Sequence, residues 1–352
     1  MDQTTLSGSK PQAVLSGQTL IIEGIEIPIE HRNMPLEDVH LDPSNPRIQH
    51  AVKQISKNGT ISQDDLRKLI LERPGVPELF KSIRDNGGIQ EPIYVRPDGR
   101  IIEGNCRAAS YQKLHDIDRK NGIDRKNNRW KNIPAVFVPD ISDRQVAILQ
   151  GQYHVAGKNK WLAYEKAGHL HHMHTHLRMD EKTIARALGM HEHDVIRDLK
   201  AYDTMTKKLL PKMKDGNGLE KWSFVQEFYK RKDLEEYRAK PTNVDAFVSL
   251  VVNKKLKRGA DVRKLAKILE HPRAVKALNK QDVDSAMSVV GKADPTADSG
   301  VFRKLKQTTS LLQHLPNTEL QRLRESEKPQ VILRELFAAV KEAAKAAGIK
   351  LS

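Results

Sequence analysis

The sequence lacks the features that mark secreted, membrane-spanning and disulfide-stabilised proteins. Its 352 residues include one cysteine, Cys106, which excludes an intramolecular disulfide. No run of about 18 apolar residues occurs, so we expect no transmembrane helix. The N-terminal segment MDQTTLSGSK has no basic stretch followed by an apolar core, so we expect no signal peptide. These absences favour a cytoplasmic protein.

Aromatic residues are also scarce, at 5%, and acidic residues are outnumbered by basic ones. The 60 Lys and Arg residues against 45 Asp and Glu residues give a net charge of +15. A surplus of this size favours a polyanionic partner, and we predict double-stranded DNA rather than a membrane surface. The length favours two or three domains.

The order of the secondary-structure signals predicts an α+β region followed by an all-α region. Residues 19–30 alternate like a strand or hairpin, and residues 36–47 are expected to form a short strand that ends in a proline-rich turn. Residues 61–86 predict two helices separated at Pro74 and Gly75. Residues 90–104 predict two strands around a turn at 97–99, and strand signals end near residue 155.

Composition divides the chain further. We predict a flexible tail (1–18), an α+β domain (19–155), a helix-turn-helix domain (156–205), a basic helical domain (206–290), a linker (291–300) and a helical C-terminal region (301–352) that is a candidate for dimerisation.

The stretch IIEGNCRAAS predicts an anion-binding turn. Gly104 ends a strand and allows a backbone shape that a side chain resists. The next amide groups open a helix and carry the positive end of its dipole. Arg107 lies in the first turn, where it can bind a phosphate, and Asn105 can cap the helix or hold a nucleotide hydroxyl. An ordinary strand-to-helix turn with a solvated arginine is the alternative.

The same stretch resembles the Gly-x-x-Arg phosphate motif of the ParB/sulfiredoxin superfamily. Asn45-Pro46-Arg47 looks like the first nucleotide-contact box of ParB N-terminal domains. Four further segments follow in the order found in ParB proteins, namely 79–87, 90–93, 133–136 and 142–143. With them the resemblance covers roughly residues 34–205. The resemblance implies a ParB/sulfiredoxin fold in residues 19–155. It also implies CTP binding, with weak hydrolysis, at Arg47, Gly104, Asn105 and Arg107.

Two departures from the family pattern bear on chemistry. The stretch 150–154, QGQYH, has no carboxylate where ParB proteins handle magnesium, and a hard cation prefers carboxylate oxygen. Magnesium-dependent hydrolysis is therefore in doubt. Counted back from the arginine, the catalytic cysteine of sulfiredoxins corresponds to Asn105, so we expect Cys106 to fill space rather than to react.

A helix-turn-helix is predicted over residues 179–202. The spacing of Ala185, Gly189 and Val195 supplies a small contact residue, a tight turn and a packing residue. The second helix is then expected to present residues to DNA, while the first helix touches phosphate. The candidate DNA contacts are Lys182, Thr183, His191, Glu192, His193, Arg197 and Lys200. A plain helical hairpin is the alternative.

The stretch HLHHMHTH, 169–176, holds five histidines. Histidine pairs four residues apart on a helix can bind zinc or nickel, but no carboxylate or cysteine partner is evident, so we predict an exposed segment and no metal site.

Together these features predict a ParB-like DNA-binding protein, dimeric, acting in segregation or regulation of a plasmid, phage or chromosome. The resemblance further implies a partner ATPase and association with nucleoid or plasmid DNA. A ParB-like nuclease using Glu103 and Asp98, and a transcription regulator without nucleotide chemistry, are the alternatives.

Overall fold

The computed structural model describes residues 18–55, 60–124, 127–156, 161–213, 217–293 and 299–350. Contacts divide the chain into two compact units. The first comprises Met1–Asn253 with Arg258–Val262, and the second comprises Lys254–Lys257 with Arg263–Ser352. No helix in the described ranges combines the length and apolar character needed to cross a bilayer.

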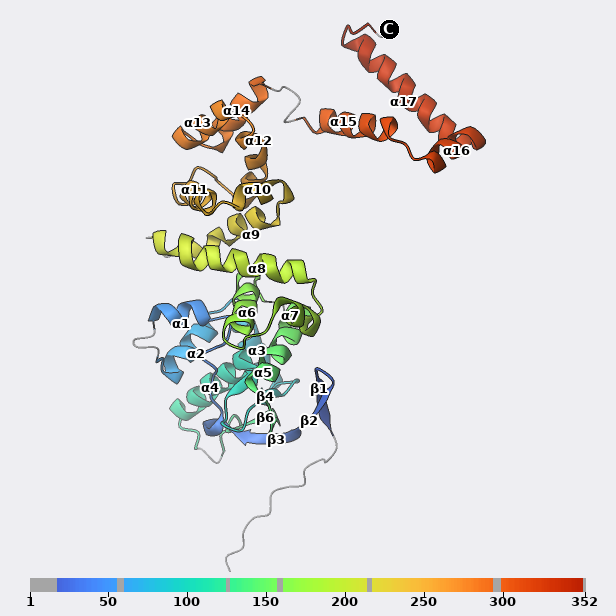
Figure 1. Cartoon of the computed structure of the whole chain (residues 1–352). Coiled ribbons are helices and arrows are strands. Elements are labelled where there is room, and N and C mark those ends of the chain that lie inside the picture. The colour runs from blue at the N-terminus through green and yellow to red at the C-terminus, as the bar shows by residue number, and fades with distance from the viewer. Residues whose placement is uncertain are drawn as a thin grey trace, which may run out of the picture. The chain divides into compact units, whose positions relative to one another are not determined.

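The first unit is built on a small mixed sheet (Figure 1). Its order is β3-β6-β4-β5, in which only the β4 and β6 pair is parallel. A separate hairpin, β1-β2, precedes it. The strands are β1 (Thr19–Ile22), β2 (Ile25–Pro28), β3 (Glu30–Pro35), β4 (Ile93–Val95), β5 (Ile101–Glu103) and β6 (Asn132–Phe137).

The strands of the sheet send alternate side chains into two cores, as the two-residue period of a strand requires. Ile101 and Ala135 join the first core, whereas their neighbours Ile102 and Val136 join the second. The first core is completed by α1 (Gln49–Ile55), α2 (Gln63–Leu71), α3 (Val76–Asn86) and α4 (Asn105–Lys120). Buried on both faces, the sheet holds the start of α4 in a fixed position.

Helix boundaries in this unit follow local chemistry. The Ser62 hydroxyl accepts the Asp65 N–H at 3.1 Å and starts α2, while Gly87, at φ 75°, ends α3. The expected break at Pro74 and Gly75 is confirmed. A Ser142–Gln145 capping box starts α5.

The second core joins the sheet to the following helices. These are α5 (Asp143–Gly151), α6 (Ala163–Thr175), α7 (Glu181–Leu188) and α8 (Glu192–Thr204). A π-helical turn, Gln152–Ala156, follows α5. Ile102 and Val136 of the sheet share this core with Ile184, Leu188 and Val195. The α7-α8 pair therefore packs on the same core as the sheet, and α8 crosses α6 (Figure 1).

The rest of the first unit is helical. It contains α9 (Trp222–Lys230), α10 (Glu235–Arg238) and α11 (Pro241–Val252). Phe228 of α9 stacks on Phe247 of α11 with ring centroids 3.9 Å apart, and both rings are fully buried. This aromatic contact fixes the two helices together.

The described residues of the second unit form helices joined by turns, with no strand among them. Its helices are α12 (Leu265–Leu269), α13 (Pro272–Lys280), α14 (Val283–Ala293), α15 (Gly300–Gln313), α16 (Asn317–Glu325) and α17 (Glu327–Ala346). Helices α12 to α14 enclose buried Leu265, Leu278 and Val283. In contrast, α15 to α17 leave large apolar side chains such as Phe302 and Phe337 exposed.

The predicted order, α+β and then all-α, is confirmed, but one predicted strand is wrong. Residues 36–47 form no strand: Leu36–Asp38 is a 3-10 turn, and His40 makes a single bridge to Arg100. One edge of the sheet is formed instead by β3, just upstream. Most of its side chains are exposed, so it carries no apolar alternation that would have marked it.

Candidate nucleotide and nucleic-acid site

The turn before α4 depends on Gly104. Its φ is 104°, a left-handed conformation, and a Cβ at this position would lie 2.6 Å from Ile93 Cγ2. The first intrahelical bond runs from the Ala108 N–H to the Gly104 carbonyl, at 3.0 Å. The amides of residues 105–107 lie before that bond and have no partner within the helix, so the turn has the backbone of an anion cradle.

Arg107 points into this turn and already has partners. Its Nη1 donates to the Glu91 carbonyl oxygen at 2.8 Å, and its Nη2 lies 3.4 Å from Glu103 Oε1. The Glu91 carboxylate is 3.5 Å away from Nη1. The side chain is only 15% exposed. An incoming phosphate would therefore compete with two carboxylates for this guanidinium.

Glu103 supplies a negative charge at the cradle. Burial alone would raise its pKa, but the hydrogen bond and charge of His154, followed by the charges of Arg107 and Arg47, hold the pKa below its usual range. Glu103 Oε2 lies 2.7 Å from His154 Nε2. The Glu103 carboxylate is therefore ionised near neutral pH. An anionic ligand that binds at this turn would be repelled by its negative charge.

The charges of Arg47 and Arg73 also act at the start of α4, as the pKa of Cys106 indicates. Burial raises the pKa of the Cys106 thiol, and the charges of Arg47, Arg73 and Arg107 offset this only in part. Cys106 is thus a thiol at neutral pH, in line with a packing role. The side chain of Arg73 pairs with Glu165 of α6. The charges of three arginines consequently act at the start of α4.

Asn105 does not cap α4, which corrects one of the two roles expected for it. Gly104 occupies the N-cap position, and Asn105 is buried inside the first turn. Its Oδ1 accepts the Asp42 N–H at 2.9 Å. Asn105 therefore ties the loop that carries Arg47 to the cradle, and its contact with a nucleotide hydroxyl stays a prediction.

The segment after α5 connects the cradle to α6. The ring of His154 stacks on Trp161 with centroids 4.6 Å apart, and Trp161 lies 4.6 Å from the ring of His169. His169 is buried, and burial lowers its pKa to about 4. Its Nε2 lies 2.8 Å from the Ala147 carbonyl oxygen, so this neutral ring is anchored to α5.

Gln150, the first residue of the stretch 150–154 that lacks a carboxylate, is used structurally. Its amide donates to the Ile102 carbonyl oxygen at 2.9 Å. Among the residues that the structure describes, no group of three or more His, Cys, Asp or Glu side chains is arranged to hold a metal ion.

The helix-turn-helix spacing produces the expected packing. Ala185 and Val195 are buried, and Gly189 ends α7 at φ 63°. The Met190 N–H returns to the Ala185 carbonyl at 2.8 Å and closes the turn. Asp180 caps α7 by accepting the Thr183 N–H at 2.8 Å.

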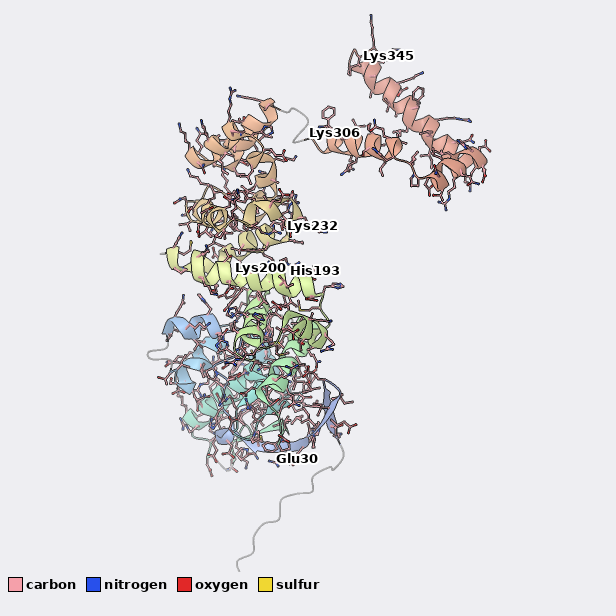
Figure 2. All side chains as sticks on the ribbon, viewed as in Figure 1. Glu30, His193, Lys200, Lys232, Lys306 and Lys345 are labelled. Atoms are coloured by element: carbon pink, nitrogen blue, oxygen red, sulfur yellow. The ribbon has the colours of Figure 1, made fainter. Side chains whose placement is uncertain are left out.

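The predicted DNA contacts fall into two groups. His191, Glu192, His193, Lys182 and Lys200 have exposed side chains, and Figure 2 marks His193 and Lys200 on α8. The other two are engaged within the protein.

Arg197 forms ion pairs with Asp194 and with Asp198, the latter at 3.1 Å. The Thr183 hydroxyl donates to Asp180 Oδ2 at 2.9 Å. The open surface is therefore concentrated at the first turn of α8, and DNA contact by Arg197 or Thr183 stays a prediction.

Sequence reasoning missed the partners that close the cradle. Arg73, Glu91 and His154 lie far from Arg107 along the chain and carry no local motif. Glu103 lies four residues before Arg107, where the strand passes into α4. This spacing was the one local signal that a carboxylate would pair with Arg107.

Of three comparisons with known proteins, the one with solved structures gives matches. A scan of family models gives no match, and a search of curated proteins gives none either. Among solved structures, the chain is similar to the C-terminally truncated chromosome-partitioning protein ParB from Caulobacter crescentus complexed to the centromeric parS site. That match has 16% identity and a TM-score of 0.34, and it covers 67% of this chain and 98% of that one.

Two more ParB structures are similar. One is the same Caulobacter crescentus protein complexed with CTP-gamma-S, with 15% identity, a TM-score of 0.21, and 63% of this chain and 98% of that chain covered. The other is a Pnob8-like ParB-N domain, with 13% identity, a TM-score of 0.39, and 72% and 99% covered. Such values are too low to transfer the role of any residue.

Proposed function

We propose that this chain is a ParB-like DNA-binding protein in which α8 enters the major groove. The observation that carries the proposal is the first turn of α8. It projects His191, Glu192 and His193 into solvent directly after a tight turn at Gly189. In helix-turn-helix proteins the N-terminal residues of the second helix contact base edges while the first helix lies against the backbone.

Charge supports a nucleic-acid partner. The net charge of +15 supplies the sequence-independent part of the affinity, because lysine and arginine release counterions from DNA. Lys182 and Lys200 are exposed on the two helices of the motif. They are placed to touch phosphate and position the protein, while base contacts supply the specificity.

The cradle at α4 is proposed to bind the phosphates of a nucleotide, with CTP as the candidate by resemblance. The amides of residues 105–107 would receive a phosphate, and Arg107 and Arg47 would supply positive charge. A glycine that leaves no room for a Cβ, with Arg107 beside it and the charges of Arg47 and Arg73 acting on the same turn, supports anion binding. Glu103 opposes that binding, so nucleotide occupancy would require Arg107 to exchange a carboxylate for a phosphate.

Exchange of this kind would act as a switch. Glu103 contacts His154, and Arg73 contacts Glu165 of α6. A ligand that draws Arg107 and Arg73 toward itself binds one arrangement of these contacts better than the other, which is the condition for shifting an equilibrium. We propose no catalytic role for magnesium here.

A homodimer is proposed through the C-terminal region. Helices α15 to α17 expose apolar side chains that a second copy can cover, among them Phe302, Leu312, Ile332 and Phe337. A dimeric DNA binder fits a role in segregation or regulation of a plasmid, phage or chromosome. It would work on nucleoid or plasmid DNA in the cytoplasm, with a partner ATPase in the case of segregation.

Selection from a library of random DNA duplexes tests the proposal. The full chain is expected to enrich a defined sequence. A variant with His191, Glu192 and His193 replaced by alanine should retain bulk DNA binding and lose the enrichment. Failure of the wild-type chain to enrich any sequence, with bulk binding intact, would leave a non-specific DNA binder.

An observation also favours a simpler function, that of a transcription regulator in which the cradle is structural. Arg107 is held by Glu91 and Glu103 within the protein itself. Titration of CTP into the chain, with ATP and GTP as controls, separates the two functions. Saturable CTP binding that Arg107→Ala abolishes supports the switch, and the absence of binding supports the regulator.

A further inference from the structure

Positive charge is concentrated in the first three helices of the second unit. Residues 254–257 and 263–293 hold ten Lys and Arg residues and three Asp and Glu residues, a net charge of +7 in 35 residues. The whole chain, of 352 residues, carries +15. This part of the second unit therefore supplies nearly half of the surplus charge that favours a polyanionic partner.

Three of these cations line the exposed side of α13. Arg273, Lys276 and Lys280 are three and four residues apart, a spacing that places them on one side of a helix, and all three are exposed. The opposite side of α13 carries Ala274 and Leu278, which are buried. We call Arg273, Lys276 and Lys280 the α13 stripe. Helix α13 thus packs by its apolar side and presents the α13 stripe to solvent.

The carboxylates of the same unit leave the α13 stripe unpaired. Lys257 Nζ lies 2.7 Å from Asp284 Oδ2 and 3.3 Å from Asp282 Oδ2. Lys264 Nζ lies 3.3 Å from Asp284 Oδ1. Among the residues that the structure describes, neither Glu270 nor any other carboxylate forms an ion pair with the α13 stripe. Its three charges are therefore available to an external anion.

The α13 stripe opposes the stability of its own helix. Arg273 lies in the first turn, which contains no acidic residue, so its charge meets the positive end of the helix dipole. Lys276 lies three residues from Arg273 and four from Lys280, and like charges at these spacings repel. Only Lys280, in the last turn, is favoured by the dipole. A polyanion bound at this face would offset these costs, which the free protein bears without compensation.

We propose that the α13 stripe binds the phosphate backbone of duplex DNA, as a second contact surface distinct from the first turn of α8. The inference rests on the proposed function, DNA binding, and locates part of the sequence-independent affinity in the second unit. Lysine and arginine that contact phosphate release counterions and hold a protein on the duplex without reading its sequence. A membrane surface suits α13 less well, because a helix that lies on a bilayer inserts its apolar side, and that side of α13 is buried within the protein.

The test compares the full wild-type chain with the triple variant Arg273→Gln, Lys276→Gln, Lys280→Gln. Fluorescence anisotropy gives the affinity for a duplex of random sequence at several salt concentrations. Loss of three phosphate contacts should reduce the slope of log affinity against log salt by about 3 and weaken binding at physiological salt at least about 10-fold. The ratio of affinities for a selected and an unrelated duplex should stay unchanged, because phosphate contacts carry no sequence information.

The matched control removes the same charge from another exposed part of the second unit. Lys328→Gln, Lys345→Gln, Lys350→Gln replaces three exposed lysines in α17 and just after it, and Figure 2 labels Lys345. The salt slope of this variant should differ from that of the wild type by less than about 1. Thermal unfolding should show that both triple variants fold, with the α13 variant at least as stable as the wild type because the repulsion within α13 is removed.

The proposal is overturned if the α13 variant keeps the wild-type salt slope. It is equally overturned if the control variant loses as much affinity, since net charge alone would then account for the binding. In both cases DNA binding by the chain would stand, whereas a wild-type chain that binds no duplex would overturn the proposed function as well. Binding to phosphatidylglycerol vesicles that the α13 variant loses, with duplex affinity unchanged, would assign the α13 stripe to a membrane surface and overturn the proposal too.

Discussion

The chain passes through a glycine in the left-handed conformation before both α4 and α8, but the surroundings of the two glycines differ. Gly104, at φ 104°, is the N-cap of α4, and Gly189, at φ 63°, is the C-cap of α7 just before α8, so both helices are preceded by a glycine in the left-handed conformation. Around Gly104 the space is filled by Ile93 and Arg107, whereas a Cβ on Gly189 would meet nothing within 4 Å. At α4 the arginine is bound by carboxylates, while the first turn of α8 faces solvent. The same backbone conformation is thus crowded before α4 and open before α8.

The two glycines provide the test with the largest expected effect. Gly104→Ala combines backbone strain with a clash against Ile93 and should lower the free energy of unfolding by about 4 kcal/mol. Gly189→Ala carries the strain alone and should cost about 1 kcal/mol. Denaturant midpoints measure both. Equal losses would contradict the contrast between a crowded and an open turn.

The buried histidine between the two sites predicts a pH dependence. The unfolded chain protonates His169 near pH 6.5 and the folded chain only near pH 4, so the unfolded state binds more protons between these values. Stability should therefore fall as the pH drops through this window, by up to about 3 kcal/mol from this residue. His169→Gln, which cannot titrate, should remove that part of the slope in pH-dependent denaturation. If the pH dependence of the free energy of unfolding is unchanged in His169→Gln, the proton taken up on unfolding binds to another residue.

Removal of the Glu103 charge should raise the affinity of the turn before α4 for a nucleotide. Glu103→Gln keeps the shape of the side chain but removes the charge that competes for Arg107, so CTP affinity should rise about 10-fold, corresponding to about 1.4 kcal/mol. The matched control is Glu91→Gln, whose carboxylate is 85% exposed and should matter less. Calorimetry provides both affinities. A loss of CTP affinity in Glu103→Gln would mean that Glu103 contributes to the site.

Lys200, which is exposed on α8, is proposed to make a single contact with a DNA phosphate. Lys200→Ala should weaken binding to all duplexes alike and reduce the slope of log affinity against log salt by about 1, because one phosphate contact is lost. Fluorescence anisotropy at several salt concentrations measures this. A change in sequence preference instead would indicate that Lys200 touches bases.

The sequence was enough to predict those parts of the site that are local. The αL turn at Gly104, the arginine in the first turn of α4 and the Ala185–Gly189–Val195 packing each depend on residues within a dozen positions. Their shapes follow from glycine conformations and helical spacing, which a sequence displays directly.

The remaining features depend on distant pairs. His154 contacts Glu103 across 51 residues, and Arg73 contacts Glu165 across 92. The histidine run was predicted to be exposed, but His169 is buried against the Ala147 carbonyl and His171 pairs with Asp203, and no spacing within the run reveals these partners. The absent strand at 36–47 shows the same limit, because β3 pairs with β6 a hundred residues later and its exposed side chains carry no pattern.

The ratio of affinities for a selected duplex and an unrelated duplex tests the central claim, that α8 reads DNA with its first turn. We predict a ratio of at least about 1,000 for the wild-type chain at physiological salt. Replacement of His191, Glu192 and His193 by alanine should lower the ratio at least about 10-fold while changing affinity for the unrelated duplex little. A wild-type ratio near one, or one that the replacements leave intact, would contradict the claim.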